Sequence, residues 1–272
     1  MEIKAAEVMK LRHATNAGMM DCKNALIEAE GDFDKAVDII RKKGLVVASK
    51  RADREAKEGC VLAVAEGKKG VMVSLNCETD FVAKNENFIN FTRQILDCAL
   101  ANMPADKEAL LALNIEGRSI ADQIAEQTGV IGEKLELAYY GKVEAEATVA
   151  YIHPGNKLAT VIGFNKEADN QVKRDVAMQA AAMAPLSIDK DDVPADIVAH
   201  ELEIGKEKAR EEGKPENMLE KIAQGRLNKF FQEATLLNQA FVKEPKETVK
   251  TYIQSHDKDL TVTSFIRFTL ND

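Results

Sequence analysis

The 272-residue chain has no tryptophan, and its 4 tyrosines, 10 phenylalanines and 6 prolines are few for its length. Alanine and charged residues are plentiful instead, a mixture that favours helix with a minority of sheet. The length suits two or three structural units, and a hydrophobic content of 45% is enough to give each of them a core. Composition therefore predicts a largely helical protein built from several units.

Long hydrophobic runs are also missing. No stretch approaches the roughly 20 apolar residues that a helix needs to cross a bilayer, and the N-terminal sequence "MEIKAAEVMKLRHAT" lacks the long apolar segment of a signal peptide. The four cysteines form no C-x-x-C pair, so they supply neither a zinc ribbon nor a redox dithiol and fit a reducing compartment. We therefore expect a cytoplasmic protein without a membrane partner.

The chain also lacks an excess of basic residues. The chain has 37 Lys and Arg residues against 45 Asp and Glu residues, which gives a net charge of −8. The basic residues are dispersed among acidic ones, and no basic block is interleaved with aromatic residues. Because affinity for nucleic acids depends on neutralising phosphates, we expect no direct nucleic-acid partner.

Catalytic motifs are absent as well. The phosphate-binding pattern G-x-x-x-x-G-K-[ST] does not occur, since "GVIGEK" from Gly129 lacks both the spacing and the hydroxyl. Neither G-x-S-x-G nor H-E-x-x-H is present. The four histidines lie far apart in the sequence, at His13, His153, His200 and His256. We expect no cofactor, no bound metal and no enzymatic activity.

One enzymatic alternative stays open, a hydrolase with Cys77 as nucleophile and Asp80 and His153 as its partners. Cys77 ends an apolar stretch, where buried and inert thiols are common. A reactive thiol needs an electropositive and partly exposed environment. This alternative therefore ranks below a role in binding another protein.

The first 44 residues predict three short helices. The first carries Ile3, Val8 and Leu11 at helical spacing, the second runs through "MMDCKNALIEAE", and the third is "DFDKAVDIIRKKG". Asp32 is placed to cap the third helix and Gly44 to end it. So small a helical unit is typical of interaction modules. The following "LVVASKRADREAKEG" predicts a charged, partly helical linker.

Around Cys60 the hydrophobic period changes from that of helices to that of strands. "CVLAVAE", a turn over Gly67–Gly70 and "VMVSLNC" predict a β-hairpin. Helices are predicted at "ENFINFTRQILDCALA" and near Lys107–Leu113 and Arg118–Thr128. The stretch "KLELAYYG" predicts a third strand, which completes a small α+β unit.

A similar order of elements recurs after that strand. "EATVAYIH", the turn "PGN" and "KLATVIGF" predict a second hairpin, and "ADNQVKRDVAMQAAAM" predicts a helix that ends at Pro185. "TSFIRFTL", at the far end of the chain, is the predicted last strand. Two related α+β units are therefore expected, each with a three-stranded antiparallel sheet backed by helices.

The stretch between that helix and the last strand contains an insertion, "PADIVAHELEIGKEKAREEGKPENMLEKIAQGRLNKFF". It predicts two helical segments hinged at "GKP", with Pro215 just inside the second. Its narrow apolar stripe consists of Ile197, Ile204, Met218, Leu219 and Ile222. A helical pair with one apolar seam is expected to form a protruding antiparallel hairpin.

These elements predict an α+β fold with four parts. The predicted divisions are 1–54 for the helical module and its linker, 55–141 for the first α+β unit, 142–186 plus 227–272 for the second, and 187–226 for the inserted hairpin.

The stretch "TDFVAKN", Thr79–Asn85, joins a predicted strand to a predicted helix. Taken alone, its residues favour a polar turn, with Asp80 as turn former, Asn85 as the N-cap of the next helix and Phe81 in the core. The alternative is that Phe81 is held out for a partner.

Met19 and Met20 follow Gly18 between the first two predicted helices. They either fill the core of the module or form a flexible apolar contact surface, since methionine adapts to a partner without a fixed shape. The residues alone do not decide between the two.

Several long motifs resemble one known family. "LRHATNAGMMDCKNALIEAEGDFDKAVDIIRKKG", "SLNCETDFVAKN", "GKPENMLEKIAQGRLNKFFQEATLLNQAFVKE" and "FIRF" are similar, in order and spacing, to bacterial translation elongation factor Ts. The resemblance covers essentially the whole chain. It has three departures, Asn16 where the family usually has glycine, and Ala138 and Tyr139 where arginines are common.

The resemblance implies a guanine-nucleotide exchange factor for elongation factor Tu, the GTPase that carries aminoacyl-tRNA to the ribosome. It implies that the first helices form a module similar to ubiquitin-associated (UBA) domains, which docks on the GTPase through Leu11, Met19 and Met20. An adaptor that uses only these helices is the second possibility.

The same resemblance implies roles for further residues. The stretch Thr79, Asp80, Phe81 and Val82 would dislocate the partner's Mg²⁺, with Phe81 entering an apolar pocket near that ion. Ile131, Gly132 and His153 match additional contacts of the family. The inserted hairpin resembles the family's coiled-coil and dimerisation region, which leaves a homodimer or a two-plus-two assembly with elongation factor Tu open.

Overall fold

A computed structural model describes residues 3–15 and 17–271, so the departure at Asn16 lies outside the described residues. The chain divides into two units. The first comprises Met1–Leu62, Met72–Gly141 and Leu270–Asp272, and the second comprises Ala63–Val71 and Lys142–Thr269. The finer division into four parts stays a prediction.

The N-terminal module is built from helices α1 (Ala5–Thr15), α2 (Met19–Glu28) and α3 (Phe33–Lys50). Apolar side chains from all of these helices face inward. The buried set comprises Val8, Leu11, Ala17, Cys22, Ala25, Leu26, Ala29 and Ala36. The carboxylate of Asp32 accepts the N–H of Lys35 at 3.0 Å, which confirms the predicted N-cap of α3.

The predicted end of α3 at Gly44 is wrong. The helix continues to Lys50, and Gly44 is buried where α3 crosses α7 (Ile120–Ile131). A Cβ atom on Gly129 of α7 would lie 2.3 Å from Gly44 Cα, so the two backbones touch at the crossing. Gly44 makes room for a neighbouring helix here, and packing against that helix overrides the local signal for a helix end.

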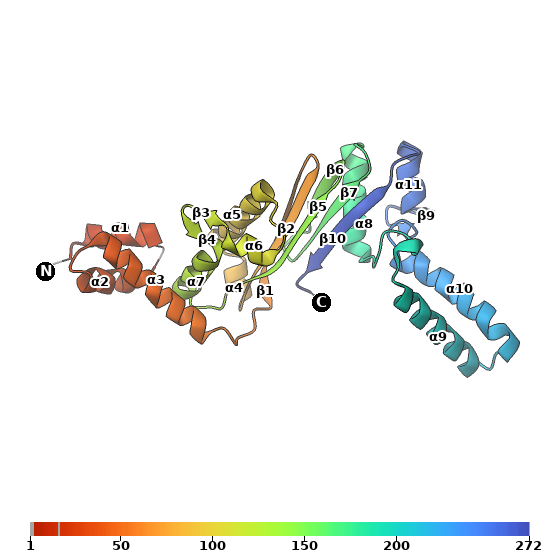
Figure 1. Ribbon diagram of the computed structural model, residues 1–272, viewed down its shortest axis with the longest axis horizontal. Coiled ribbons are helices and arrows are strands. Elements are labelled where there is room, and N and C mark those ends of the chain that lie inside the picture. Colours follow the sequence, from red (N-terminus) through yellow and green to blue (C-terminus); the bar gives the residue numbers. More distant parts are fainter. Residues whose placement is uncertain (1–2, 16, 272) are drawn as a thin grey trace. The chain divides into compact units, whose positions relative to one another are not determined.

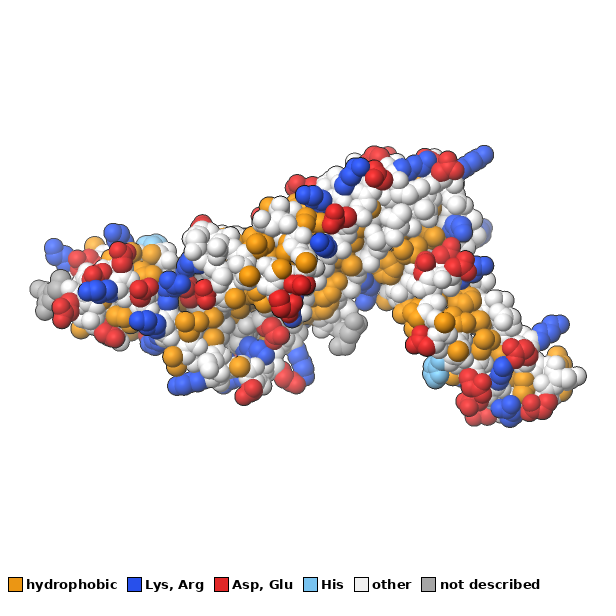
Figure 2. All heavy atoms as spheres, in the orientation of Figure 1, with side chains coloured by type: hydrophobic (Ala, Val, Ile, Leu, Met, Phe, Trp, Pro, Cys, Tyr) orange, Lys and Arg blue, Asp and Glu red, His pale blue; other side chains and the backbone are white. Residues whose placement is uncertain are grey.

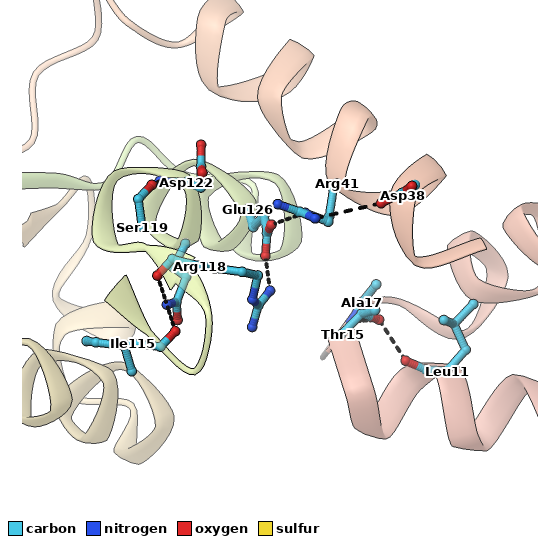
Figure 3. Close-up of polar contacts among 11 residues, drawn as sticks. Leu11, Thr15, Ala17, Asp38, Arg41, Ile115, Arg118, Ser119, Asp122 and Glu126 are labelled. Atoms are coloured by element: carbon cyan, nitrogen blue, oxygen red, sulfur yellow. Dashed lines mark hydrogen bonds and ion pairs between the residues drawn. The ribbon is translucent and has the colours of Figure 1, made fainter. Parts of the chain in front are cut away.

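An ion-pair cluster joins the same two helices beside the crossing (Figure 3). Glu126 of α7 accepts from Arg41 Nε of α3 at 2.6 Å and from Arg118 at 2.5 Å. The Glu126 side chain is 14% exposed, so water screens these pairs less than it screens pairs at an open surface. The N-terminal module is therefore attached through α3 to the rest of the first unit.

A sheet with the strand order β1-β2-β5, as the predicted hairpin and third strand require, lies only partly in the first unit, because Ala63–Val71 and the end of β5 from Lys142 onward belong to the second. Its strands are β1 (Glu58–Glu66), β2 (Lys69–Cys77) and β5 (Glu136–Glu144). The helices α4 (Asp80–Ala83), α5 (Glu86–Asn102) and α6 (Lys107–Ala112) follow β2. A short pair, β3 (Asn114–Ile115) with β4 (Arg118–Ser119), precedes α7. From Gly70 onward β2 is buried at every residue, which explains its nearly continuous apolar sequence.

The second unit contains the second predicted sheet, with the strand order β10-β7-β6. Its strands are β6 (Ala147–Ile152), β7 (Leu158–Phe164) and β10 (Val262–Thr269), and both pairings are antiparallel. The predicted return of the last strand to this sheet is thereby confirmed. Helix α8 (Asn170–Met183) packs on β6 and β7 and buries Val172, Val176 and Ala180 against Phe164 (Figure 1).

Shorter elements complete the second unit. They are η1 (Lys190–Asp192), β8 (Ala240–Phe241), β9 (Glu244–Thr248) and α11 (Val249–His256). The ring of Tyr252 on α11 stacks on Phe241 with centroids 4.1 Å apart, and its hydroxyl donates to the buried carboxylate of Asp175 on α8 at 2.9 Å. This contact attaches α11 to the core of the unit.

The insertion forms two helices side by side, α9 (Ala195–Glu211) and α10 (Glu216–Ala234) (Figure 1). Pro215 is the N-cap of α10 instead of its first helical residue. Lys and Arg side chains are mixed with Asp and Glu side chains over the face of this hairpin seen in Figure 2.

The predicted seam of the hairpin needs a correction at Met218, whose side chain is 45% exposed. The buried seam residues are Gly205, Ala209, Leu219, Ala223 and Leu227. A Cβ atom on Gly205 would lie 3.0 Å from Ala223 Cα, so the helices approach too closely for long side chains at that level. Small residues therefore make the contact that the apolar pattern had assigned to larger ones.

Candidate partner-binding site

The stretch Thr79–Asn85 folds as the single helical turn α4 between β2 and α5. Thr79 caps this turn, because its Oγ1 accepts the N–H of Val82 at 3.5 Å. Asn85 caps α5 by accepting the N–H of Asn87 at 2.9 Å, as the sequence predicted. Two successive N-caps thus define where the chain turns between strand and helix.

Phe81 points out of this turn and is 84% exposed. The core position that the residues alone favoured for Phe81 is therefore wrong. Leaving a phenylalanine side chain in water forgoes about 1.5–3 kcal/mol of burial free energy. Of the exposed large hydrophobic side chains among the described residues, that of Phe81 has the largest exposed fraction. Such exposure marks a contact surface when other apolar groups lie beside it.

A groove of about 570 Å³, lined by both polar and apolar side chains, lies beside Phe81. Its walls come from α1, α4, α5 and α7, and its apolar lining consists of Phe81, Val82, Phe88, Phe91, Val130 and Ile131. The structure therefore brings Ile131 to the same surface as Phe81. Gly132 follows Ile131 at the end of α7 with φ of +77°, a left-handed conformation that ends the helix.

Glu133 holds the Thr79 end of the turn. Its Oε2 accepts the backbone N–H groups of Glu78 at 3.1 Å and Thr79 at 3.0 Å, and its Oε1 accepts the Thr79 hydroxyl at 2.7 Å. Sequence reasoning missed Glu133. The one local signal at Glu133 is its position directly after Gly132, which ends α7. That position does not indicate a hydrogen bond to Thr79, 54 residues away in the sequence.

Glu78 makes the reciprocal contact. Its Oε1 accepts the backbone N–H of Lys134 at 2.6 Å, and its two oxygens also accept from Arg51 at 3.1 Å and Arg54 at 3.0 Å. The Lys134 N–H, together with these guanidinium groups, holds the pKa of the Glu78 carboxyl below its ordinary value. Its contribution to stability is therefore present above the ordinary glutamate pKa and is lost as the pH falls through the lowered one.

Asp80 lies at the start of α4 and pairs with Lys84 one turn later, at 2.6 Å. This pairing raises the pKa of Lys84. Both side chains are well exposed, so the ion pair contributes little to stability by itself. Asp80 therefore keeps a carboxylate at the surface next to Phe81.

The predicted docking residues of the N-terminal module divide into two groups. Met19 and Met20, at the start of α2, are 43% and 65% exposed, which favours a contact surface over core filling. Leu11 is fully buried in the core of the module. Its side chain therefore packs between the helices of the module, and its contact with a partner stays a prediction.

His153 belongs to the second unit and lies in the turn between β6 and β7. Its side chain is exposed, and its Nδ1 is 3.0 Å from the hydroxyl of Tyr151. The tyrosine thereby restrains the imidazole at the surface, where a partner could reach it.

The structure argues against Cys77 as the nucleophile of a hydrolase. Cys77 is fully buried, its thiol donates to the carbonyl of Thr79 at 3.2 Å, and burial raises its pKa to about 12. The thiolate that would attack a substrate is therefore scarce at neutral pH. Over residues 3–15 and 17–271, no group of three or more His, Cys, Asp or Glu side chains could hold a metal ion.

No helix in the described part of the chain is long and apolar enough to cross a membrane.

Comparison with known proteins identifies the family. The model of the family described as "Elongation factor TS" matches residues 78–272. Elongation factor Ts of Porphyromonas gingivalis strain W83 is 52% identical over 272 residues, covering 100% of this chain and 99% of the relative. The homologous factors of Azobacteroides pseudotrichonymphae, at 53% identity with 100% and 99% coverage, and Christiangramia forsetii, at 49% with 99% of both chains covered, are similarly related.

An exposed phenylalanine beside a groove with apolar side chains, and exposed methionines on a helical module, are features typical of proteins that act by binding another protein. The matches place this protein among the bacterial translation elongation factors. The chain belongs to the elongation factor Ts family. Membership supports the predicted role of a guanine-nucleotide exchange factor for elongation factor Tu, which is not a catalytic enzyme in the usual sense.

Proposed function

We propose that this protein releases GDP from elongation factor Tu by inserting Phe81, on the Thr79–Val82 loop, next to the nucleotide's Mg²⁺ and phosphate site. The observation that carries the proposal is the 84% exposure of Phe81 on a turn that is capped at both ends. An exposed aromatic on a restrained turn loses little conformational freedom when it binds. We call Thr79–Val82 the wedge loop.

The nucleotide site of a GTPase is sensitive to such an insertion. The phosphates are held by backbone amides and by Mg²⁺, and Mg²⁺ requires nearly ideal octahedral geometry. A side chain that displaces its ligands by a small distance removes a large part of the binding energy of the nucleotide. No acid, base or cofactor is needed for this step, in agreement with the lack of catalytic motifs in the sequence.

Linkage determines how exchange proceeds. If the factor weakens GDP binding by some ratio, GDP must weaken binding of the factor by the same ratio. The ternary complex therefore holds neither ligand tightly, and GTP can replace GDP. Contacts away from the nucleotide must supply the affinity that brings the wedge loop to its target.

Those contacts are proposed to come from several surfaces. Met19 and Met20 on the UBA-like module would dock on the GTPase domain. Ile131 and Gly132 would contact it beside the wedge loop, because Ile131 lines the same groove as Phe81. His153 would add a contact from the second unit. Asp80, exposed next to Phe81, would meet basic or polar groups of the partner.

The α9–α10 hairpin is proposed to be the coiled coil of the family and a surface for self-association. Either a homodimer or a two-plus-two assembly with elongation factor Tu would follow. Sedimentation equilibrium of the protein alone and of the complex distinguishes these states from a monomer and a one-to-one complex. The cytoplasmic location, and the absence of nucleic-acid and membrane partners, stay predictions.

The proposed function is tested by the release of fluorescently labelled GDP from elongation factor Tu in stopped flow. Adding this protein in the presence of excess unlabelled GDP is expected to accelerate release by several orders of magnitude, up to a plateau as the factor saturates its partner. Binding without any change in the release rate would support the adaptor instead. The Cys77→Ser variant is expected to retain the full rate, since the thiol is buried.

Replacing both Met19 and Met20 with alanine tests the docking role of the module. The half-saturating concentration of the factor is expected to rise about tenfold, since truncating two anchor side chains costs about 1.4 kcal/mol or more. The release rate at saturation is expected to stay the same, because these residues lie away from the wedge loop in sequence.

The matched control for that experiment is Met183→Ala. Met183 is 44% exposed at the end of α8, so its exposure is close to that of Met19. An unchanged half-saturating concentration in the double variant, or an equal rise in the control, would refute the docking role of the module.

A further inference from the structure

Two glutamates hold the wedge loop against the turn that follows α7. Glu133 accepts three hydrogen bonds from Glu78 and Thr79, and Glu78 accepts the backbone N–H of Lys134. Each carboxylate thus accepts a backbone N–H from the segment that carries the other glutamate. We call this arrangement, made by residues 78–79 and 133–134, the glutamate clasp.

The clasp connects Phe81, the side chain proposed to act in exchange, to the segments that hold its turn in place. Thr79 is both a hydrogen-bond donor to Glu133 and the N-cap of α4. Its hydroxyl donates to Glu133 and accepts the backbone N–H of Val82. Phe81 lies within the turn capped in this way. Fixing Thr79 therefore fixes the first residue of the turn that presents Phe81.

The clasp is also connected to the end of α3. Arg51 follows α3 directly, and both Arg51 and Arg54 donate to the Glu78 carboxylate. The Glu78 side chain is 19% exposed, so these charge-assisted bonds are partly shielded from water. The Glu78 carboxylate thereby links the segment that follows α3 to the wedge loop.

We propose that Glu133 is a positioning residue for nucleotide exchange, which acts through Thr79 to keep Phe81 in its inserting orientation. The inference rests on the proposed function of Phe81. A charged acceptor with three donors is a strong restraint on a short loop, because bonds to charged groups are worth more than neutral ones. Glu133 itself touches neither nucleotide nor metal in this role.

A positioning role predicts that the GDP release rate at saturation falls while the half-saturating concentration of the factor hardly changes. The Glu133→Ala variant is expected to lower the GDP release rate at saturation about tenfold, in line with the loss of hydrogen bonds to a charged group. The half-saturating concentration is expected to stay within about twofold, because Met19, Met20 and His153 are unaltered. The Glu133→Gln variant keeps the shape and one acceptor oxygen, so it is expected to recover part of the rate.

The control is Glu136→Ala, a glutamate three residues further on. Glu136 is 48% exposed, and its carboxylate pairs with Lys134 Nζ at 3.1 Å rather than with residues 78–79. It is expected to leave both kinetic quantities unchanged. A general loss of fold in the Glu133 variants would instead lower the fraction of active factor and the melting temperature together.

A mutant cycle with Phe81→Ala separates this inference from the proposed function. If Glu133 acts through Phe81, the double variant is no slower than Phe81→Ala alone. Additive slowing, or a normal rate in Glu133→Ala while Phe81→Ala is slow, would overturn the positioning role and leave the wedge intact. A normal rate in Phe81→Ala would overturn the wedge itself.

A measurement on the free factor tests the positioning without any exchange assay. The chain has no tryptophan, so Phe81→Trp introduces a single indole fluorophore. Adding Glu133→Gln or Glu133→Ala to that variant is expected to lower the fluorescence anisotropy of the indole, and Glu136→Ala is expected not to. Unchanged anisotropy in the folded Glu133 variants would contradict the inference.

Discussion

Phe81→Ala is expected to slow GDP release from elongation factor Tu about thirtyfold at saturating factor, with the fold unchanged. Truncating a central aromatic anchor of an interface costs about 2 kcal/mol or more, which corresponds to that ratio. Because the side chain is 84% exposed, its loss is expected to change the free energy of unfolding by no more than about 0.5 kcal/mol. Stopped-flow release of labelled GDP and urea denaturation measure the two quantities.

The control for Phe81→Ala is Leu186→Ala, which removes a side chain that is 49% exposed in the second unit. This variant is expected to match the unaltered protein in exchange. Should Phe81→Ala unfold the protein, or should release remain as fast as with the unaltered factor, Phe81 would not be the wedge.

Gly129→Ala is expected to lower the free energy of unfolding by about 1–3 kcal/mol, the usual cost of overpacking. The new Cβ would lie 2.3 Å from Gly44 Cα, whereas ordinary contacts lie at 3.4–4 Å, so α3 and α7 must separate. The displaced α3 carries Arg41, whose bond to Glu126 at 2.6 Å depends on the same crossing. Thermal and urea unfolding measure the loss.

Gly225→Ala is the matched control, because Gly225 is also in a helix and a Cβ there meets nothing within 4 Å. Alanine forms helix better than glycine by about 1 kcal/mol, so this variant is expected to be as stable as the unaltered protein or slightly more stable. A Gly129→Ala protein as stable as this control would show that the helices do not need their close approach. The half-saturating concentration for exchange is expected to rise only in Gly129→Ala, since α3 links the docking methionines to the first unit.

Features encoded within a few residues were predictable. The N-caps at Asp32 and Asn85 follow from side chains that accept a nearby backbone N–H, and both are present. The two hairpins follow from strand periodicity broken by short turns. The return of β10 to the second sheet was also predicted, as the last strand of the recurring α+β order.

Features that depend on distant segments were missed or wrong. Gly44 has the local character of a helix end, but Gly129, far along the sequence, makes it a crossing point. Met218 belongs to the apolar stripe by spacing but is 45% exposed, whereas Gly205 and Ala223 approach closely in the seam.

Patterns along the chain were enough to predict the elements, their caps, the lack of catalytic motifs and the resemblance to elongation factor Ts. Contacts between distant segments are what place Phe81 in water, bring Ile131 to the same groove and let Glu133 hold Thr79 across 54 residues of chain. The two kinds of feature differ in range. Hydrophobic period and capping act over a few residues, whereas the direction of a side chain on a turn depends on which distant groups bind the backbone around it.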